Sequence, residues 1–178
     1  MLNRLKMRVK QPSFWFKQCR DLFILIAVLF AVATYMQRDM AKGIAPNILA
    51  VDINLQPISE FNHSPPQATL VYFWGSWCSI CSITSPSVNR IFLDGTPVIT
   101  VAVASGSNTQ VTDYLTDHDY QFPVINQSEQ QSYSQQWGAF GLPAIYIVDK
   151  HNQIAFVTSG ATSYWGLKLR LWLTDLLA

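Results

Sequence analysis

The chain has 178 residues, 49% of them apolar and 13% charged, which is too apolar for a disordered protein and long enough for one domain plus an appendage. Its formal net charge of +1 conceals a split, because residues 1–38 hold seven of the twelve Lys and Arg against one acid, Asp21. From Asp39 onward ten acidic residues face five basic ones, so the body offers no basic patch and we expect no nucleic-acid partner.

The N-terminal part divides into a basic segment, residues 1–21, and an apolar segment, residues 22–37, that contains no charged residue. As a helix the apolar segment would span roughly 24 Å, short of a ~30 Å hydrocarbon core, and snorkelling of Arg20 and Arg38 can cover the difference. The Lys and Arg before it place residues 1–21 in the cytoplasm and send the rest across. We therefore predict an uncleaved transmembrane anchor.

Two alternatives stay open for this segment. Ala31-Val32-Ala33 resembles a signal-peptidase site, which would make the segment a cleaved signal peptide, and its length also suits a buried core helix. The anchor and the signal peptide both place residues 39–178 outside the cytoplasm. In a bacterium this predicts attachment to the inner membrane with the C-terminal domain in the periplasm, an oxidising compartment.

Residues 38–46 are predicted to form a short polar linker, and residues 47–178 the folded domain. Its first part is a lead-in β-hairpin of strands 48–53 and 57–61, followed by a proline-rich loop, 62–67. The apolar run 68–74 is typical of a central strand covered on both faces. Further strands are predicted at 97–104, 123–126, 142–149 and 153–158, and helices at 82–93, 107–119 (with Asn108 as its N-cap), 129–138 and 163–177. This order predicts an α/β fold with a mixed sheet flanked by helices.

The redox chemistry is predicted between the central strand and the helix after it. Cys78 and Cys81 are two residues apart and can close into a disulfide and reopen. Cys78 falls where the helix begins, and the unpaired N–H groups and positive end of the helix dipole favour its thiolate. Cys78 is therefore expected to be the more nucleophilic sulfur. Cys19 is left over and is expected to be an inert small residue, with lipidation as the alternative.

The run from Trp74 to Cys81 (Trp-Gly-Ser-Trp-Cys-Ser-Ile-Cys), with Pro86 after it and Gly141-Leu142-Pro143-Ala144 far downstream, resembles the thioredoxin superfamily. With the anchor, the hairpin and the strand that begins Phe122-Pro123-Val124, the chain is similar to membrane-tethered extracytoplasmic thioredoxins of the TlpA/ResA type. Most of all it resembles the suppressor-for-copper-sensitivity D proteins. The resemblance covers residues 47–178.

The resemblance implies that Cys78 attacks and Cys81 resolves, with Pro143 as a cis-proline facing the pair and Leu142 supporting it. Pro86 would kink the helix and Gly160 would be a packing glycine. It also implies protein thiol or disulfide substrates, a transmembrane electron donor, and no cofactor beyond the Cys78–Cys81 disulfide itself.

Two features depart from the resemblance. Tyr72 stands where thioredoxins carry a buried carboxylate, and the loop at Ser105-Gly106-Ser107 has no acid. The proton of Cys81 therefore has no evident acceptor, with water or Tyr72 as the alternatives. The dipeptide Ser79-Ile80 carries no positive charge, and this favours a reductase or isomerase over a strong oxidase.

Other functions and roles remain as alternatives. The Cys pair could instead bind Cu(I), whereas a zinc site is disfavoured because no second Cys-x-x-Cys exists. An inert structural disulfide is also disfavoured, since so small a ring restrains little chain entropy.

The histidines are expected to be surface or capping residues: His63, His118 and His151. Trp77 either packs at the domain edge or flanks the exposed sulfur as a docking surface. The other tryptophans are expected to pack: Trp74, Trp137, Trp165 and Trp172.

Overall fold

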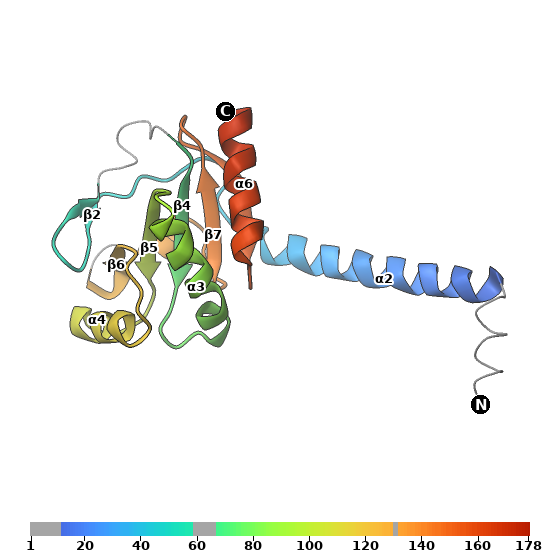
Figure 1. The fold of residues 1–178 in the computed structure, drawn as a ribbon, viewed down its shortest axis with the longest axis horizontal. Helices are drawn as coiled ribbons and strands as arrows, with labels where there is room; N and C mark the ends of the chain where they lie inside the picture. Colours follow the sequence, from blue (N-terminus) through green and yellow to red (C-terminus); the bar gives the residue numbers. More distant parts are fainter. Residues whose placement is uncertain (1–11, 59–66, 130–131) are drawn as a thin grey trace. The chain divides into compact units, whose positions relative to one another are not determined.

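The computed structural model describes residues 12–58, 67–129 and 132–178. The chain forms two units, Met1–Arg38 and Asp39–Ala178 (Figure 1). Several predictions lie outside the described residues: the basic residues before position 12, the end of the strand 57–61, nearly all of the loop 62–67 with His63, and positions 130–131 of the helix 129–138.

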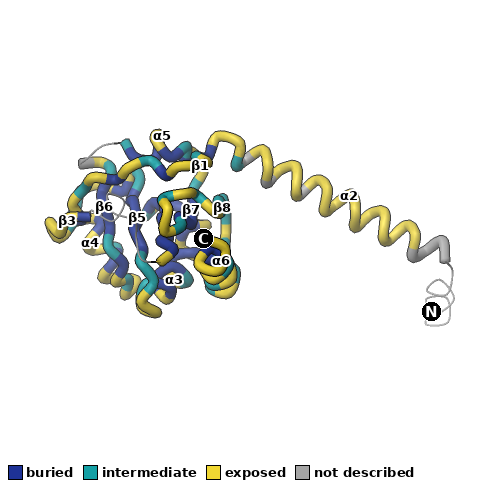
Figure 2. The backbone as a smooth tube through the Cα atoms, turned by 90° about the horizontal axis from the view of Figure 1, so that it is seen from above, coloured by how far each residue is buried: buried dark blue, intermediate teal, exposed yellow. Residues whose placement is uncertain are grey.

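The first unit is the helix α2 (Pro12–Met36), which contains most of the segment 22–37. Within this unit the apolar residues from Leu22 to Ile26 are exposed, and the helix is coloured accordingly in Figure 2. Within the described residues, no helix combines the length and the apolar character needed to cross a membrane, so the predicted span is not found.

The second unit is built on a six-stranded sheet in the order β1-β8-β7-β4-β5-β6. Its strands are β1 (Gly43–Ile44), β4 (Thr69–Trp74), β5 (Val98–Ala102), β6 (Val124–Asn126), β7 (Ala144–Val148) and β8 (Gln153–Ser159). Strands β4, β5 and β6 are parallel, and β7 runs antiparallel to β4, so the predicted mixed sheet is confirmed. Every residue of β4 is buried, as its continuous apolar run predicts.

The alternation along β4 divides the core into two faces. Leu70, Tyr72 and Trp74 pack in one cluster with residues of α3 (Ser79–Leu93), α4 (Asn108–Asp117) and α6 (Tyr164–Leu177). Val71 and Phe73 pack in the other, with the N-terminal residues of the unit and the short helix α5 (Tyr133–Gln136). The redox helix α3 therefore lies on the face that Tyr72 occupies.

The segment predicted as a linker is part of the domain. Met40 and Ala45 are buried, Ala41 N–H donates to the Trp137 carbonyl at 2.9 Å, and β1 pairs with β8. The domain thus begins at Asp39 rather than at residue 47. Residues 39–46 contain Gly43 and Pro46 and show no helix or strand periodicity, so only their contacts in the domain identify Met40 and Ala45 as core residues.

Other elements differ from prediction in extent. The lead-in hairpin is present as a separate two-stranded sheet of β2 (Ala50–Val51) and β3 (Pro57–Ile58). Ser107, not Asn108, caps α4, because its hydroxyl accepts from Gln110 N–H in a capping box. The helix predicted at 129–138 is reduced to α5, preceded by the 3-10 turn η1 (Gln127–Glu129).

The final helix buries Leu167 and Leu171, but its tryptophans lie outside the core. Trp165 and Trp172 are 73% and 58% exposed, and Leu176 and Leu177 are exposed as well. The prediction that Trp165 and Trp172 pack in the core is wrong, because apolar side chains occur on two faces of α6 and only one of these faces meets the sheet. Trp74 and Trp137 are fully buried, as predicted.

Replacing Gly138 with alanine is expected to destabilise the protein more than the same change at Gly95. Both glycines have positive φ, +64 and +84, which costs any side chain about 1 kcal/mol or more. A Cβ at Gly138 would also overlap the Asp39 carbonyl, whereas one at Gly95 would meet nothing within 4 Å. We expect Gly138→Ala to lower the free energy of unfolding in urea by roughly 2 kcal/mol more than Gly95→Ala. Equal losses would show that residues 39–41 do not pack in the domain.

Candidate active site

The redox loop follows the C-terminal end of β4. Cys78 is the N-cap of α3, and its sulfur accepts a hydrogen bond from Cys81 N–H at 3.2 Å. The loop therefore leaves the sheet at the C-terminal end of a central strand. A tight turn, in which the Gly75 carbonyl accepts from Cys78 N–H at 3.1 Å, then leads into the helix. The sulfur of Cys78 thus lies where N–H groups and the helix dipole stabilise negative charge.

Cys78 and Cys81 are joined by a disulfide, so the structure shows the oxidised form. The two sulfurs differ in access, because Cys78 is 8% exposed and Cys81 is fully buried. A partner can reach only the first of them. This is the asymmetry that the predicted division into attacking and resolving cysteine requires.

Trp77 lies beside the disulfide in a fixed position. Its indole N–H donates to the Val103 carbonyl at 3.1 Å, and its ring lies so close to Gly75 that a Cβ there would be 2.7 Å from the indole nitrogen. The loop is held further by Ser76 N–H, which donates to Ser105 Oγ at 3.0 Å. Trp77 is nevertheless 62% exposed, so one edge of the ring is anchored and the rest is available to a partner.

The second chain segment at the site precedes β7. The Leu142–Pro143 peptide bond is cis, as the resemblance implied, and Pro143 is buried. Because Phe73 pairs with Ala144, Pro143 lies beside the C-terminal end of β4, where the redox loop begins. Its carbonyl accepts from Gly160 N–H at 3.0 Å, and Leu142 packs against the cluster that contains both cysteines.

Pro86 and Gly160, whose roles the resemblance implied, have different outcomes. Pro86 lies inside α3, where it removes one helical N–H. Gly160 has φ +93, and a Cβ there would meet nothing within 4 Å. Its implied role as a packing glycine is therefore wrong, and its left-handed turn explains the residue instead.

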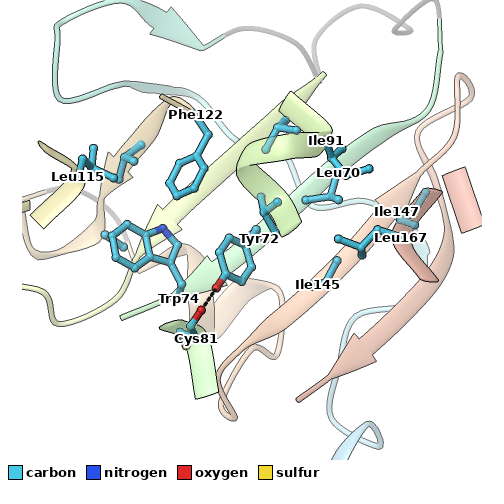
Figure 3. Close-up of a cluster of buried hydrophobic side chains, with 14 of the residues drawn as sticks. Leu70, Tyr72, Trp74, Cys81, Ile91, Leu115, Phe122, Ile145, Ile147 and Leu167 are labelled. Carbon is cyan, nitrogen blue, oxygen red and sulfur yellow. Dashed lines mark hydrogen bonds between the residues drawn. The ribbon is translucent and has the colours of Figure 1, made fainter. Parts of the chain in front are cut away.

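Tyr72 lies beneath the second cysteine. Its hydroxyl is 3.0 Å from Ser85 Oγ and donates to the Cys81 carbonyl at 3.4 Å (Figure 3). Burial raises the pKa of Tyr72 well above its ordinary value, so the phenol stays protonated at neutral pH. The hydroxyl also meets the Cys81 carbonyl and not its sulfur, so neither its geometry nor its protonation favours Tyr72 as the acceptor of the Cys81 proton. Sequence reasoning missed Ser85, although its position four residues after Cys81 puts both on one helix face.

No cluster of metal ligands forms around the cysteines. Among the described residues, no group of three or more His, Cys, Asp or Glu could hold a metal ion. His118 caps the C-terminus of α4 and stacks on Tyr114, and His151 is an exposed turn residue, as predicted. The Cu(I) alternative depends on the two sulfurs alone and stays a prediction.

Known proteins resemble this chain in sequence and in fold. The Redoxin family model matches residues 40–164. A thioredoxin-like protein of Haemophilus influenzae is 32% identical over 155 residues, 87% of this chain and 92% of that protein. The thiol-disulfide oxidoreductase ResA of Oceanobacillus iheyensis is 22% identical over 88% of this chain and 86% of its own length. The crystal structure of StoA from Bacillus subtilis has a TM-score of 0.61 at 21% identity, covering 69% of this chain and 94% of that one.

Proposed function

Because this chain belongs to the Redoxin family and is a thioredoxin-like protein-disulfide oxidoreductase, we propose that it works outside the cytoplasm as a reductase or isomerase. The observation that carries the proposal is the arrangement of the pair. One sulfur is accessible at a helix N-terminus, the other is buried behind it, and the residues between them are uncharged. The particular likeness to the suppressor-for-copper-sensitivity D proteins stays a prediction.

The reaction proceeds in two exchanges of sulfur bonds. The Cys78 thiolate attacks a partner disulfide, so a mixed disulfide forms and one partner sulfur leaves as a thiolate. The Cys81 thiol loses its proton to solvent, and its thiolate attacks Cys78 Sγ and expels the second partner sulfur. The partner gains two electrons and two protons, and Cys78–Cys81 becomes the disulfide. The reverse sequence oxidises a partner.

Whether the protein reduces or oxidises its partner follows from how strongly the fold stabilises the Cys78 thiolate. The helix N-terminus does so, but the residues around the sulfur are neutral: Ser76, Trp77, Ser79, Ile80 and Ser105. Because none of these described neighbours carries a positive charge, the disulfide is not strongly disfavoured relative to the reduced dithiol. We expect a reduction potential closer to the ~−270 mV of reducing thioredoxins than to the ~−120 mV of strong periplasmic oxidants.

The potential can be measured by equilibrating the protein with glutathione or dithiothreitol buffers and quantifying the free thiols by alkylation. A Cys19→Ser background removes the third thiol, which is exposed and forms no disulfide. A value near that of strong oxidants would contradict the reductase or isomerase role.

The compartment is also a proposal. We propose that residues 22–37 attach the protein to the bacterial inner membrane, with residues 39–178 in the periplasm and a transmembrane donor supplying electrons. Exposed apolar side chains at successive positions of α2 support it, since they face every direction around the helix and favour an apolar surrounding.

Cell fractionation tests the compartment. We expect peptides from residues 1–30 in washed, carbonate-treated membranes, and labelling of reduced Cys78 by a thiol reagent that does not enter the cytoplasm. Recovery from the soluble cytoplasm, or labelling only after lysis, would contradict the proposal. Membrane material that lacks residues 1–30 would contradict the uncleaved attachment alone.

A further inference from the structure

The phenol of Tyr72 connects the central strand to the first turns of the redox helix. Tyr72 and Ser85 are both fully buried, and their oxygens are 3.0 Å apart. The same phenol donates to the main-chain carbonyl of Cys81, not to its sulfur. If the buried Tyr72 hydroxyl lost these partners, it would be left without hydrogen bonds and away from water, which costs free energy. The hydrogen bonds therefore hold β4 and α3 together.

The groups around this hydroxyl leave it neutral. Tyr72 packs edge-on against Phe122 at 6.5 Å, and the other titratable groups that affect it are the phenols of Tyr114 and Tyr120. The charged groups on the packed helices lie at exposed or half-buried positions: Arg90 and Asp94 on α3, Asp113, Asp117 and His118 at α4, and Lys168, Arg170 and Asp175 on α6. Asp94 accepts hydrogen bonds from the Tyr164 hydroxyl and from Lys168 Nζ, and Asp175 accepts one from Ala68 N–H.

We propose that Tyr72 is a positioning residue for Cys81, and that its hydroxyl, shared with Ser85, holds the resolving cysteine in place while the disulfide is open. This inference rests on the two-step exchange proposed above. In the oxidised form the disulfide itself fixes both sulfurs. In the mixed disulfide that link is broken, and the position of Cys81 then depends on its place in α3, its core packing and the hydrogen bond from Tyr72 to its carbonyl. We infer that this hydrogen bond helps to keep the Cys81 sulfur aligned with the bond that it must attack.

The consequence is a separation between the two chemical steps. Attack by Cys78 depends on its partly accessible sulfur and on the helix N-terminus, and Tyr72 contacts neither through any described hydrogen bond. Resolution by Cys81 depends on the position that Tyr72 holds. Because the phenol stays protonated, it moves no proton, and the pH dependence of resolution belongs to the Cys81 thiol.

The test uses the full chain, reduced, with Cys19→Ser, and the chromogenic disulfide 5,5′-dithiobis(2-nitrobenzoate) as the probe in stopped flow. Attack by Cys78 releases one coloured thiolate, and resolution by Cys81 releases the second. We expect Tyr72→Phe to slow the second release about tenfold and to leave the first within about twofold, since one hydrogen bond is lost in one step. The alkaline rise of the second release should keep its midpoint.

Two further variants keep the test specific. Ser85→Ala removes the partner hydroxyl and should slow the second release in the same direction. Tyr146→Phe is the matched control, because Tyr146 is also fully buried and donates to the Trp137 carbonyl on the opposite face of the sheet. It should lower stability but leave both releases unchanged.

The outcomes separate this inference from the proposed function. Equal slowing of both steps in Tyr72→Phe, no slowing of the second step, or a displaced pH midpoint would overturn the positioning role while exchange itself stands. If the unsubstituted pair releases only one thiolate, the two-step exchange fails and the inference fails with it.

Discussion

Replacing Cys78 with serine is expected to lower the rate of insulin disulfide reduction, with dithiothreitol as reductant, by about 10³-fold or more, to the uncatalysed background. The reason is chemical, because a serine hydroxyl stays protonated at the helix N-terminus where the thiol forms a thiolate. The structure allows no substitute, since Cys81 is fully buried beneath the loop and cannot meet a partner disulfide.

The matched control is the same substitution at Cys19, an exposed cysteine in the other unit of the chain. Cys19→Ser should keep the insulin reduction rate within about twofold, because Cys19 is a free cysteine and forms no disulfide with the redox pair. A loss at Cys19 equal to that at Cys78, or full activity in Cys78→Ser, would show that another site performs the reduction.

Replacing Trp137 with alanine is expected to lower the free energy of unfolding by about 3–5 kcal/mol, the range for removing a large aromatic from a core. Trp137 is fully buried and packs against Phe73 at 5.8 Å and Tyr146 at 4.9 Å between ring centres. It also accepts through its carbonyl from Ala41 N–H, so its displacement would release the N-terminal residues of the domain.

Trp165→Ala provides the comparison, because Trp165 is 73% exposed at the start of α6. The same chemical change there should cost less than about 0.5 kcal/mol. Both variants can be measured by urea unfolding followed by circular dichroism. Similar losses at the two positions would contradict the burial that distinguishes them.

The sequence was sufficient to predict the central unit of this fold. The apolar run before Trp74 and the helical spacing after Cys81 are strong periodic patterns, and they place the cysteines between a central strand and a helix as found. The resemblance supplied Pro143, whose position depends on the pairing of β4 with β7 and has no local signal near the cysteines.

Features that depend on tertiary contacts could not be predicted in this way. Residues 39–46 contain Gly43 and Pro46 and show no periodic apolar pattern, yet Met40 packs on the face of the sheet opposite α3. Trp165 and Trp172 look like core residues, yet they lie on the side of α6 away from the sheet. The role proposed for Tyr72 could not be predicted from the sequence, because it depends on a hydrogen bond to Ser85 that only the structure shows. A buried hydroxyl needs a hydrogen-bond partner, and the sequence does not say which residue provides it.

The most direct test of the account is to map where a substrate attaches when resolution is blocked. The reduced Cys81→Ser protein is mixed with a peptide that contains one disulfide, quenched with acid, digested and analysed by mass spectrometry. We expect a stable mixed disulfide on Cys78, and no stable adduct on Cys81 in the reciprocal Cys78→Ser protein. An adduct on Cys19 alone, or equal adducts on Cys78 and Cys81 in the two variants, would contradict it.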